Sequence, residues 1–131
     1  DCFQQTCYDN PDMTPAERNA FYNKLEKEFL PHMTTEGIPA LQDGRRWQRQ
    51  AHIFESPFYY IDYCFAQFTA LQFLALSQQD YKGAFDKYIK FLNYGGTKPF
   101  TELLSECDLL SPFEEDSFKL VVSACEKILG L

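Results

Sequence analysis

A histidine and three tyrosines lie close together in the middle of this sequence, where they could act on one reacting carbonyl group. His52 is followed by Tyr59, Tyr60 and Tyr63, and Asp62 stands beside the last of these. On a helix, the spacing of Tyr60 and Tyr63 would place both phenols on one face. Two such phenols could donate hydrogen bonds to a developing oxyanion, and His52 could serve as a third donor or a general acid.

The same residues also fit a purely structural role. The phenols could bond to Asp62 or to a loop carbonyl inside a core, and His52 could be a loop histidine whose ring nitrogens are satisfied. Spacing alone favours this second interpretation. The catalytic interpretation therefore needs support from elsewhere in the sequence.

No other motif in the chain supplies a nucleophile or a metal site. The two histidines, His32 and His52, are far apart, and no His-Glu-x-x-His sequence is present. The sequence also lacks a glycine-rich phosphate loop and a Gly-x-Ser-x-Gly motif. We therefore expect hydrogen-bond donors without a nucleophile, and no metal bound by this chain alone.

The composition indicates a folded, acidic chain of one domain. The chain has 131 residues, of which 17% are aromatic, and its net charge is −7. Because no basic stripe extends beyond Arg45, Arg46 and Arg49, we expect no nucleic-acid partner. The five cysteines form no Cys-x-x-Cys pair, and three lie in apolar helical patterns. This usage predicts reduced thiols and a cytoplasmic location.

A long apolar run predicts the helix that positions the tyrosines. Ser56 is a suitable N-cap and Pro57 suits the first helical position, so a helix is expected over about 57–78. From Phe58 to Leu76 almost every face is apolar or aromatic. A helix without a polar stripe must be covered on all sides, so we expect it to be buried at the centre of the fold.

The same run is long enough to span a bilayer, but polar side chains interrupt it. Asp62, Gln67 and Gln72 would be costly in lipid, and no flanking cluster of lysine or arginine would orient a span. We therefore expect a core helix and no membrane partner.

Two helices are predicted before this central one. Residues 1–9 have the pattern of the last turns of a helix that begins upstream. Thr14 to Glu17 form a capping box that should begin the second helix, and Pro31 should end it. Residues 31–51 then form a long loop. The apolar stripe of the second helix is Phe21, Leu25 and Phe29.

Three more helices are predicted after the central one. Asp80 should begin the first, and Gly95 with Gly96 should end it. A short helix from Phe100 to Cys107 follows, and a second capping box from Ser111 to Glu114 should begin the last. The expected buried positions of the first and last of these helices are Tyr81, Phe85, Tyr88 and Leu92, and Phe118, Val121, Val122, Cys125 and Ile128. The predicted fold class is all-α, with five or six helices packed around the central helix.

The block from Trp47 to Gln72 resembles the C-terminal part of oligoendopeptidase F-type enzymes, which belong to the thimet oligopeptidase family of zinc metallopeptidases. The part from His52 to Tyr63 is the most specific. The resemblance implies that residues 1–131 form a single C-terminal helical subdomain of a larger metallopeptidase. Shorter matches extend the likeness over nearly the whole chain: Phe3-Gln4, Tyr8-Asp9-Asn10-Pro11, Leu25-Glu26-Lys27, Leu30-Pro31 and Tyr94-Gly95-Gly96.

The resemblance also implies a site. In this family a His-Glu-x-x-His helix and a later glutamate hold zinc inside a deep channel of a helical fold, and the motif glutamate activates water. That ligand set would lie upstream, so zinc is expected as a cofactor of the full-length enzyme and not of this chain. A histidine and tyrosines near the family's C-terminus stabilise the tetrahedral intermediate or hold the peptide backbone. The matching positions are His52, Tyr60 and Tyr63 as catalytic residues, and Tyr59 as a substrate-binding residue.

One departure affects the register of this match. Distant relatives have glycines between the histidine and the tyrosines, whereas residues 55–58 are Glu, Ser, Pro and Phe. The choice between Tyr59 and Tyr60 therefore stays open.

The sequence as a whole favours a C-terminal fragment of a cytoplasmic zinc oligoendopeptidase that hydrolyses short peptides. The fragment would supply channel wall and transition-state donors and would be inactive alone. Its expected partners are peptide substrates of the whole enzyme, the missing N-terminal catalytic part, and a second copy of the fragment. The alternative is a stand-alone all-α interaction module without catalysis.

Overall fold

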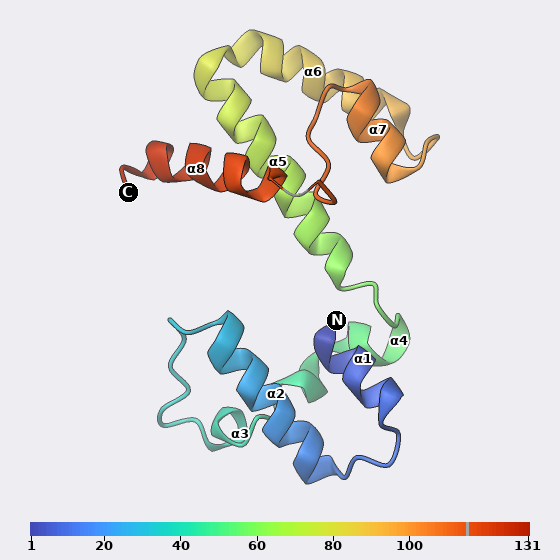
Figure 1. The fold of residues 1–131 in the computed structure, drawn as a ribbon, viewed down its shortest axis with the longest axis vertical. Helices are drawn as coiled ribbons and strands as arrows, with labels where there is room; N and C mark the ends of the chain where they lie inside the picture. The colour runs from blue at the N-terminus through green and yellow to red at the C-terminus, as the bar shows by residue number, and fades with distance from the viewer. Residues whose placement is uncertain (115) are drawn as a thin grey trace. The chain divides into compact units, whose positions relative to one another are not determined.

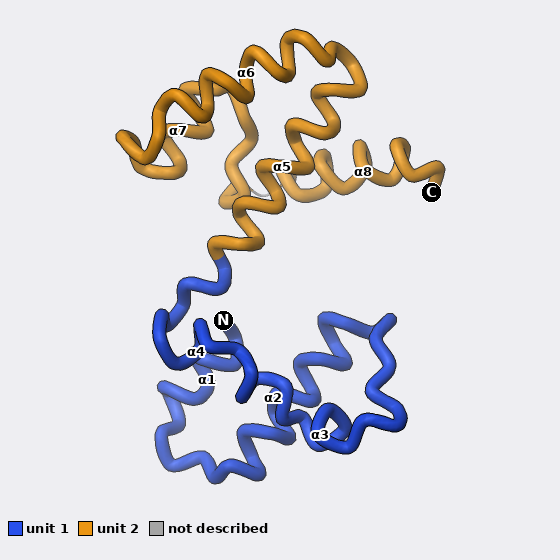
Figure 2. The backbone as a smooth tube through the Cα atoms, turned by 180° about the vertical axis from the view of Figure 1, so that it is seen from behind, with its two compact units in different colours: residues 1–61 blue, residues 62–131 orange. Residues whose placement is uncertain are grey.

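The computed structural model describes residues 1–114 and 116–131, and these divide into two compact units, Asp1–Ile61 and Asp62–Leu131 (Figure 2). The described residues form eight α-helices and one short 3-10 helix, and no strand occurs among them. The all-α prediction is therefore confirmed. That the chain is a single C-terminal subdomain stays a prediction.

Unit 1 is built from helices and their connections (Figure 1), and its core is aromatic. Phe3 and Trp47 are buried, and their ring centroids lie 5.0 Å apart. The indole of Trp47 donates from Nε1 to Asn19 Oδ1 at 2.9 Å, which satisfies its polar atom inside the core. The helices of this unit are α1 (Cys2–Asp9), α2 (Pro15–Phe29), α3 (Pro39–Gln42), the 3-10 helix η1 (Arg46–Arg49) and α4 (Ala51–Glu55).

The start and the end of α2 are as the sequence predicts. The Thr14 hydroxyl accepts from the Glu17 backbone N–H at 3.3 Å, and the Glu17 carboxylate accepts from the Thr14 N–H at 2.7 Å. These two bonds form the predicted capping box. The helix ends at Phe29, with Leu30 as its C-cap directly before Pro31.

The predicted long loop over residues 31–51 is wrong in its second half. This segment contains α3 and η1, and α4 begins at its last residue. A close approach fixes the path of the chain at Gly44, whose φ is +70° and where a Cβ atom would collide with the carbonyl oxygen of Asn19. The segment is therefore folded against α2 rather than extended as a loop.

The long apolar helix begins later than predicted. It is α5 (Ile61–Gln79), whereas Ser56 is the C-cap of α4 and residues 57–60 form a turn. Phe58 has a φ of 62°, a left-handed conformation that interrupts a right-handed helix. An N-cap signal at Ser56 and a proline at the next position thus introduce a turn here instead of a helix.

Unit 2 contains α5 apart from its first residue, with α6 (Tyr81–Tyr94), α7 (Phe100–Glu106) and α8 (Ser117–Leu129). Its core is formed by Leu104, Cys107 and Leu109. Partly buried apolar side chains of α5, α6 and α7 pack against this core, among them Phe73, Leu76, Phe91, Tyr94, Phe100 and Leu103.

The prediction that α5 is buried on every face is wrong for this chain. Phe68, Thr69 and Gln72 are buried, but Tyr63 is 51% exposed and Leu74 is 41% exposed. Gln72 is accommodated inside because its amide donates to the Leu110 carbonyl at 3.0 Å and accepts from the Leu110 N–H at 2.7 Å. The helix therefore has one packed side and one open side.

The ends of α6 are correctly predicted, but its buried face is not. Asp80 caps the first turn by accepting from the Gly83 N–H, and Gly95 ends the helix in the left-handed conformation. Ala84 is buried and Phe91 and Tyr94 are half-buried. The predicted positions Tyr81, Phe85, Tyr88 and Leu92 are all exposed.

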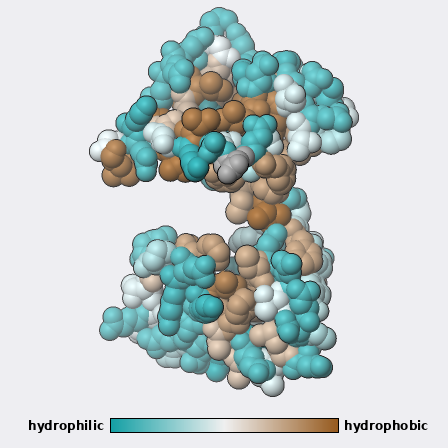
Figure 3. Space-filling view, viewed as in Figure 1, coloured by the Kyte–Doolittle hydropathy of each residue, from teal (hydrophilic) through white to brown (hydrophobic). Residues whose placement is uncertain are grey.

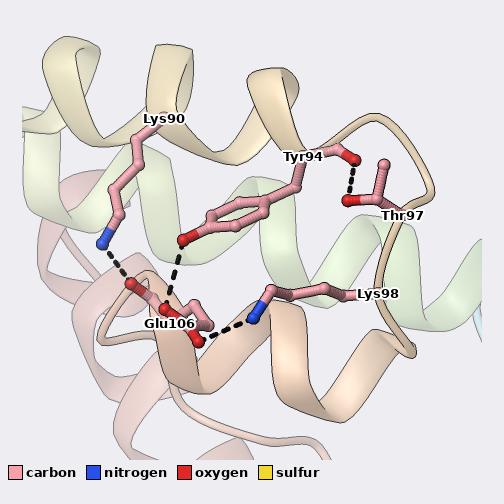
Figure 4. A network of polar contacts seen from close by, with 5 residues as sticks. All are labelled: Lys90, Tyr94, Thr97, Lys98 and Glu106. Carbon is pink, nitrogen blue, oxygen red and sulfur yellow. Dashed lines mark hydrogen bonds and ion pairs between the residues drawn. The ribbon is translucent and has the colours of Figure 1, made fainter.

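A polar network joins α6 to α7 (Figure 4). The Glu106 carboxylate pairs with Lys98 at 2.7 Å and accepts from the Tyr94 hydroxyl at 3.1 Å. Lys90 donates to the Glu106 carbonyl near the C-terminal end of α7. Hydrogen bonds from Lys98 and then from Tyr94 lower the pKa of Glu106.

The second predicted capping box is wrong. Helix α8 begins at Ser117 with Asp116 as its N-cap, not within residues 111–114. Ser111 instead accepts from the Phe113 N–H at 3.3 Å, and Ser117 donates to the Glu114 carbonyl at 2.8 Å. On α8 itself Val121 is buried and the ring of Phe118 lies 4.5 Å from that of Phe68 on α5, but the predicted buried positions Phe118, Val122 and Ile128 are exposed.

All five cysteines are free thiols, and of these Cys107 is buried in the core whereas Cys64 on α5 is exposed. None of the described helices is both long and apolar enough to cross a membrane.

Candidate active site

His52 and two of the tyrosines meet in unit 1. His52 lies on α4, and Tyr59 and Tyr60 lie in the turn that follows. The imidazole ring stacks on Tyr59 with centroids 5.9 Å apart, and it meets the ring of Tyr60 edge-on at 5.1 Å. These contacts bring all three predicted side chains of this unit into one aromatic cluster, which we call the His52 cluster.

The His52 cluster combines a supported imidazole with accessible phenols. His52 is half-buried, whereas Tyr59 and Tyr60 are 44% and 40% exposed. Packing between the aromatic rings limits how the imidazole can turn, while both tyrosines retain accessible surface. The cluster therefore keeps part of its tyrosine surface open to a bound molecule.

Tyr63 lies in unit 2, in the first turn of α5. The prediction that Tyr60 and Tyr63 share one helix face is wrong, because Tyr60 belongs to the turn before the helix. Tyr63 is the most exposed of the predicted site residues. It presents its phenol from a regular helix, whereas Tyr60 presents its own from a turn.

A pocket of about 220 Å³ in unit 1 includes Tyr60 in its wall. Arg46, Tyr22 and Gln4 also line it, and sequence reasoning missed all three as site residues. They come from η1, α2 and α1, so no local spacing links them to the histidine and tyrosine motif. The other lining residues are Asp1, Phe3, Leu30, Gln50 and Ile53.

An ion pair stands next to this pocket. Arg46 Nη1 lies 3.4 Å from Glu26 Oε1, and the two side chains are 31% and 12% exposed. The same nitrogen lies 3.3 Å from the Met33 sulfur. Burial raises the pKa of Tyr22, the Glu26 carboxylate raises it further, and the Arg46 guanidinium opposes both effects. Tyr22 therefore stays a protonated hydrogen-bond donor at neutral pH.

Unit 2 carries a larger and far more apolar groove. It has a volume of about 640 Å³ and runs along α5 from Asp62 to Phe73. Five phenylalanines line it, from α5, α6, α7 and the segment before α8: Phe65, Phe73, Phe91, Phe100 and Phe113. Hydrophobic surface gathers where Figure 1 draws these helices (Figure 3). This groove has the character of a packing surface rather than of a reactive site.

The side chains that the structure describes do not fit a metal site. Among residues 1–114 and 116–131, no group of three or more His, Cys, Asp or Glu side chains is arranged to hold a metal ion.

The chain that carries this histidine and tyrosine cluster matches a known family of peptidases. The model of peptidase family M3 matches residues 1–119. Because this match spans most of the chain, the protein belongs to peptidase family M3. The predicted resemblance to oligoendopeptidases is thereby confirmed at the level of the family.

Two solved structures of peptidases are similar to this chain. One is assigned as an oligoendopeptidase F, with a TM-score of 0.90 and 43% identity over 98% of this chain and 23% of that one. The other is PZ peptidase A with an inhibitor, with a TM-score of 0.90 and 42% identity over the same shares. This chain thus spans less than a quarter of the length of either structure. A search of the curated proteins gives no match.

Proposed function

We propose that this chain is the C-terminal part of a zinc-dependent oligoendopeptidase that hydrolyses short peptides in the cytoplasm. The observation that carries this proposal is the likeness to two peptidases over 98% of this chain at more than 40% identity. At that identity both the fold and the side chains of a site are expected to be retained, in contrast to a likeness of fold alone.

The proposed contribution of this chain to the reaction is electrostatic. Attack on a peptide carbonyl turns its oxygen into an oxyanion, which hydrogen-bond donors at the right place stabilise more than they stabilise the substrate. We assign this role to His52, Tyr60 and Tyr63, and we assign Tyr59 to holding the peptide. The accessible phenols and the packing of His52 support these assignments.

Zinc and the water-activating carboxylate belong, in this proposal, to a part of the enzyme other than this chain. The lack of fit between the described side chains and a metal site supports that division. No step that we assign to His52 or to the tyrosines requires these residues to touch the metal.

If the catalytic part is a separate portion of the enzyme, it can also cover the apolar groove of unit 2. The related peptidases continue for most of their length beyond the part that matches this chain. We propose that helices of that catalytic part cover the groove in the whole enzyme. A chain alone would leave it open, and large apolar patches drive association. We therefore expect the isolated chain to form dimers.

The experiment compares the isolated chain with the full-length enzyme. The full-length enzyme should contain zinc and cleave a short fluorogenic peptide until a chelator is added. The isolated chain should hold no zinc in metal analysis and cleave nothing. One tightly bound zinc per isolated chain, with activity that a chelator removes, would contradict the division of labour. A full-length protein without peptidase activity would favour a non-catalytic interaction module.

A further inference from the structure

The pocket beside Tyr60 has the donors that recognise a carboxylate. We propose that it is a subsite for a carboxylate group of the peptide substrate, bound by Arg46 together with Tyr22. This inference rests on the proposed peptidase function. It adds two residues, from η1 and α2, that neither the histidine and tyrosine motif nor its spacing identifies.

Hydrogen-bond donors dominate the polar part of the pocket wall. Arg46 contributes a guanidinium, Tyr22 contributes a phenol, and Gln50 contributes an amide. The buried Gln4 amide already donates to the Ile53 carbonyl at 3.4 Å, so it belongs to the frame of the pocket. A wall of this kind suits a group that only accepts hydrogen bonds, which is the property of an ionised carboxylate.

The guanidinium of Arg46 is anchored from one side. Both polar contacts that the structure describes for it, with Glu26 and with the Met33 sulfur, run through Nη1. Arg46 also lines a separate pocket together with these two residues, so it stands between two hollows of unit 1. The edge of the guanidinium formed by Nε and Nη2 has the geometry that binds a carboxylate through two parallel hydrogen bonds.

The surroundings strengthen such a contact. Phe3, Leu30 and Ile53 form apolar walls, which lower the local dielectric constant and so increase the attraction between opposite charges. The phenol of Tyr22 stays protonated because burial and the Glu26 carboxylate raise its pKa. Asp1 also lines the pocket, but it is exposed, so solvent and salt screen its charge.

The carboxylate can come from two places in a peptide. A C-terminal carboxylate in this pocket would fix the end of the substrate relative to Tyr60, so cleavage would fall at a fixed distance from that end. An aspartate or glutamate side chain would instead set a preference at one position of the sequence. The chemistry of recognition is the same, and the choice of peptides separates the two sources.

The experiment uses the full-length enzyme with matched fluorogenic peptides. One pair ends in a free carboxylate or in its amide, and a second pair, with an amidated end, carries an internal glutamate or glutamine. We expect Arg46→Gln to lower kcat/KM for the preferred carboxylate peptide about 10- to 100-fold, mainly through KM, with the matching amide hardly affected. For Arg46→Lys, kcat/KM for the carboxylate peptide should lie between the values of the parent enzyme and Arg46→Gln. A lysine keeps the positive charge but cannot form two parallel hydrogen bonds with a carboxylate. Tyr22→Phe should also lower kcat/KM for the carboxylate peptide, but by a smaller factor than Arg46→Gln.

The control is Arg45→Gln, which makes the same change of charge at the neighbouring position. Arg45 does not line the pocket, is about half exposed, and pairs with Asp43 at 3.0 Å. The preference of the Arg45→Gln variant for the carboxylate peptide over the amide peptide should match that of the parent enzyme. If Arg46→Gln fails to fold because Glu26 loses its partner, the double variant Glu26→Gln with Arg46→Gln removes both charges together.

The outcomes separate this inference from the proposed function. A carboxylate preference that Arg46→Gln leaves unchanged, or a parent enzyme that cleaves all four peptides equally, overturns the subsite while the peptidase stands. An enzyme that cleaves none of them contradicts the peptidase function instead. Fluorescence anisotropy with the labelled carboxylate and amide peptides then tests the subsite without hydrolysis. Equal affinity for the two forms overturns it, and tighter binding of the carboxylate, lost in Arg46→Gln, supports it.

Discussion

The two units of this chain differ in what they leave accessible. Unit 1 exposes polar and aromatic groups around a small pocket, and an ion pair between Arg46 and Glu26 stands beside it. Unit 2 exposes a groove almost three times as large, lined mainly by phenylalanine and other apolar side chains. Most of the exposed large hydrophobic residues of the described chain also belong to unit 2.

This difference indicates a division of work along one short chain. Donors and charges suit the recognition and stabilisation of a polar reacting group, so unit 1 is where we place most of the chemistry. An open apolar groove suits coverage by further protein, so unit 2 is where we place the junction with the rest of the peptidase. Tyr63 is the exception, because it is a proposed catalytic phenol on a helix of unit 2.

The largest expected effect tests that exception. In the full-length enzyme, Tyr63→Phe should lower kcat by ~10²–10³, or roughly 3–4 kcal/mol, with little change in KM. The substitution removes one oxygen from a half-exposed side chain, so stability should fall by about 1 kcal/mol at most. Steady-state kinetics and a thermal melt on one preparation separate the two effects. A kcat within about threefold of the parent, with a lower melting temperature, would assign Tyr63 to packing.

The next effect tests the core of unit 2. Leu104 is fully buried, so Leu104→Ala should cost about 2–5 kcal/mol of stability through lost burial and a residual cavity. Denaturant unfolding of the same preparation measures the change. Leu120→Ala is the matched control, because Leu120 is largely exposed on α8 and its truncation should cost less than about 0.5 kcal/mol. Equal losses for the two variants would mean that the assigned core is wrong.

A smaller effect tests the frame of unit 1. Thr14→Ala removes the hydroxyl that accepts from the Glu17 N–H and should cost about 1 kcal/mol of unfolding free energy. Glu17→Gln keeps an acceptor for the Thr14 N–H, so it should cost less. Chemical denaturation of both variants gives the comparison. A larger loss in Glu17→Gln than in Thr14→Ala would show that charge, and not the capping geometry, stabilises this helix start.

The smallest expected effect is that the stability of the polar network between α6 and α7 depends on pH. The pKa of Glu106 is lowered in the folded protein. The stabilisation that its carboxylate contributes is therefore complete above the ordinary glutamate pKa of 4.5, and it is lost as the pH falls through the lowered pKa. The network should therefore loosen below about pH 4.5. Amide hydrogen exchange in α7 between pH 6 and pH 3, corrected for intrinsic rates, measures this. Glu106→Gln should remove the dependence, and an unchanged profile in that variant would refute the assignment.

Local signals in the sequence predicted the helical fold and several helix ends. Thr14 and Glu17, Asp80, and Gly95 act within one turn of their own position, so their roles can be read from neighbouring residues. The late start of α5 could not be read in this way, because it depends on the left-handed conformation of Phe58. Which apolar positions of α6 face inwards depends on the partner helix, so periodicity alone selected the wrong face.

The candidate site was predictable only in part, for the same reason. The histidine and tyrosines form a contiguous motif, so a resemblance to known peptidases could identify them. Arg46, Tyr22 and Gln4 join Tyr60 only after three separate elements fold together. A substrate preference that depends on such long-range contacts cannot be predicted from the spacing of residues in one sequence.

The most direct test of the account asks whether the assigned side chains act on the transition state. In the full-length enzyme, the affinity for a tetrahedral phosphinic peptide should be measured beside kcat/KM in His52→Gln, Tyr60→Phe and Tyr63→Phe, with Tyr59→Phe for comparison. A residue that stabilises the oxyanion contributes to the affinity for a tetrahedral analogue and to kcat/KM alike. We predict that the inhibition constant rises in proportion to the loss of kcat/KM in the first three variants, while KM changes little. Unchanged inhibition constants in all three, with lower melting temperatures, would contradict the account and leave these residues as parts of the fold.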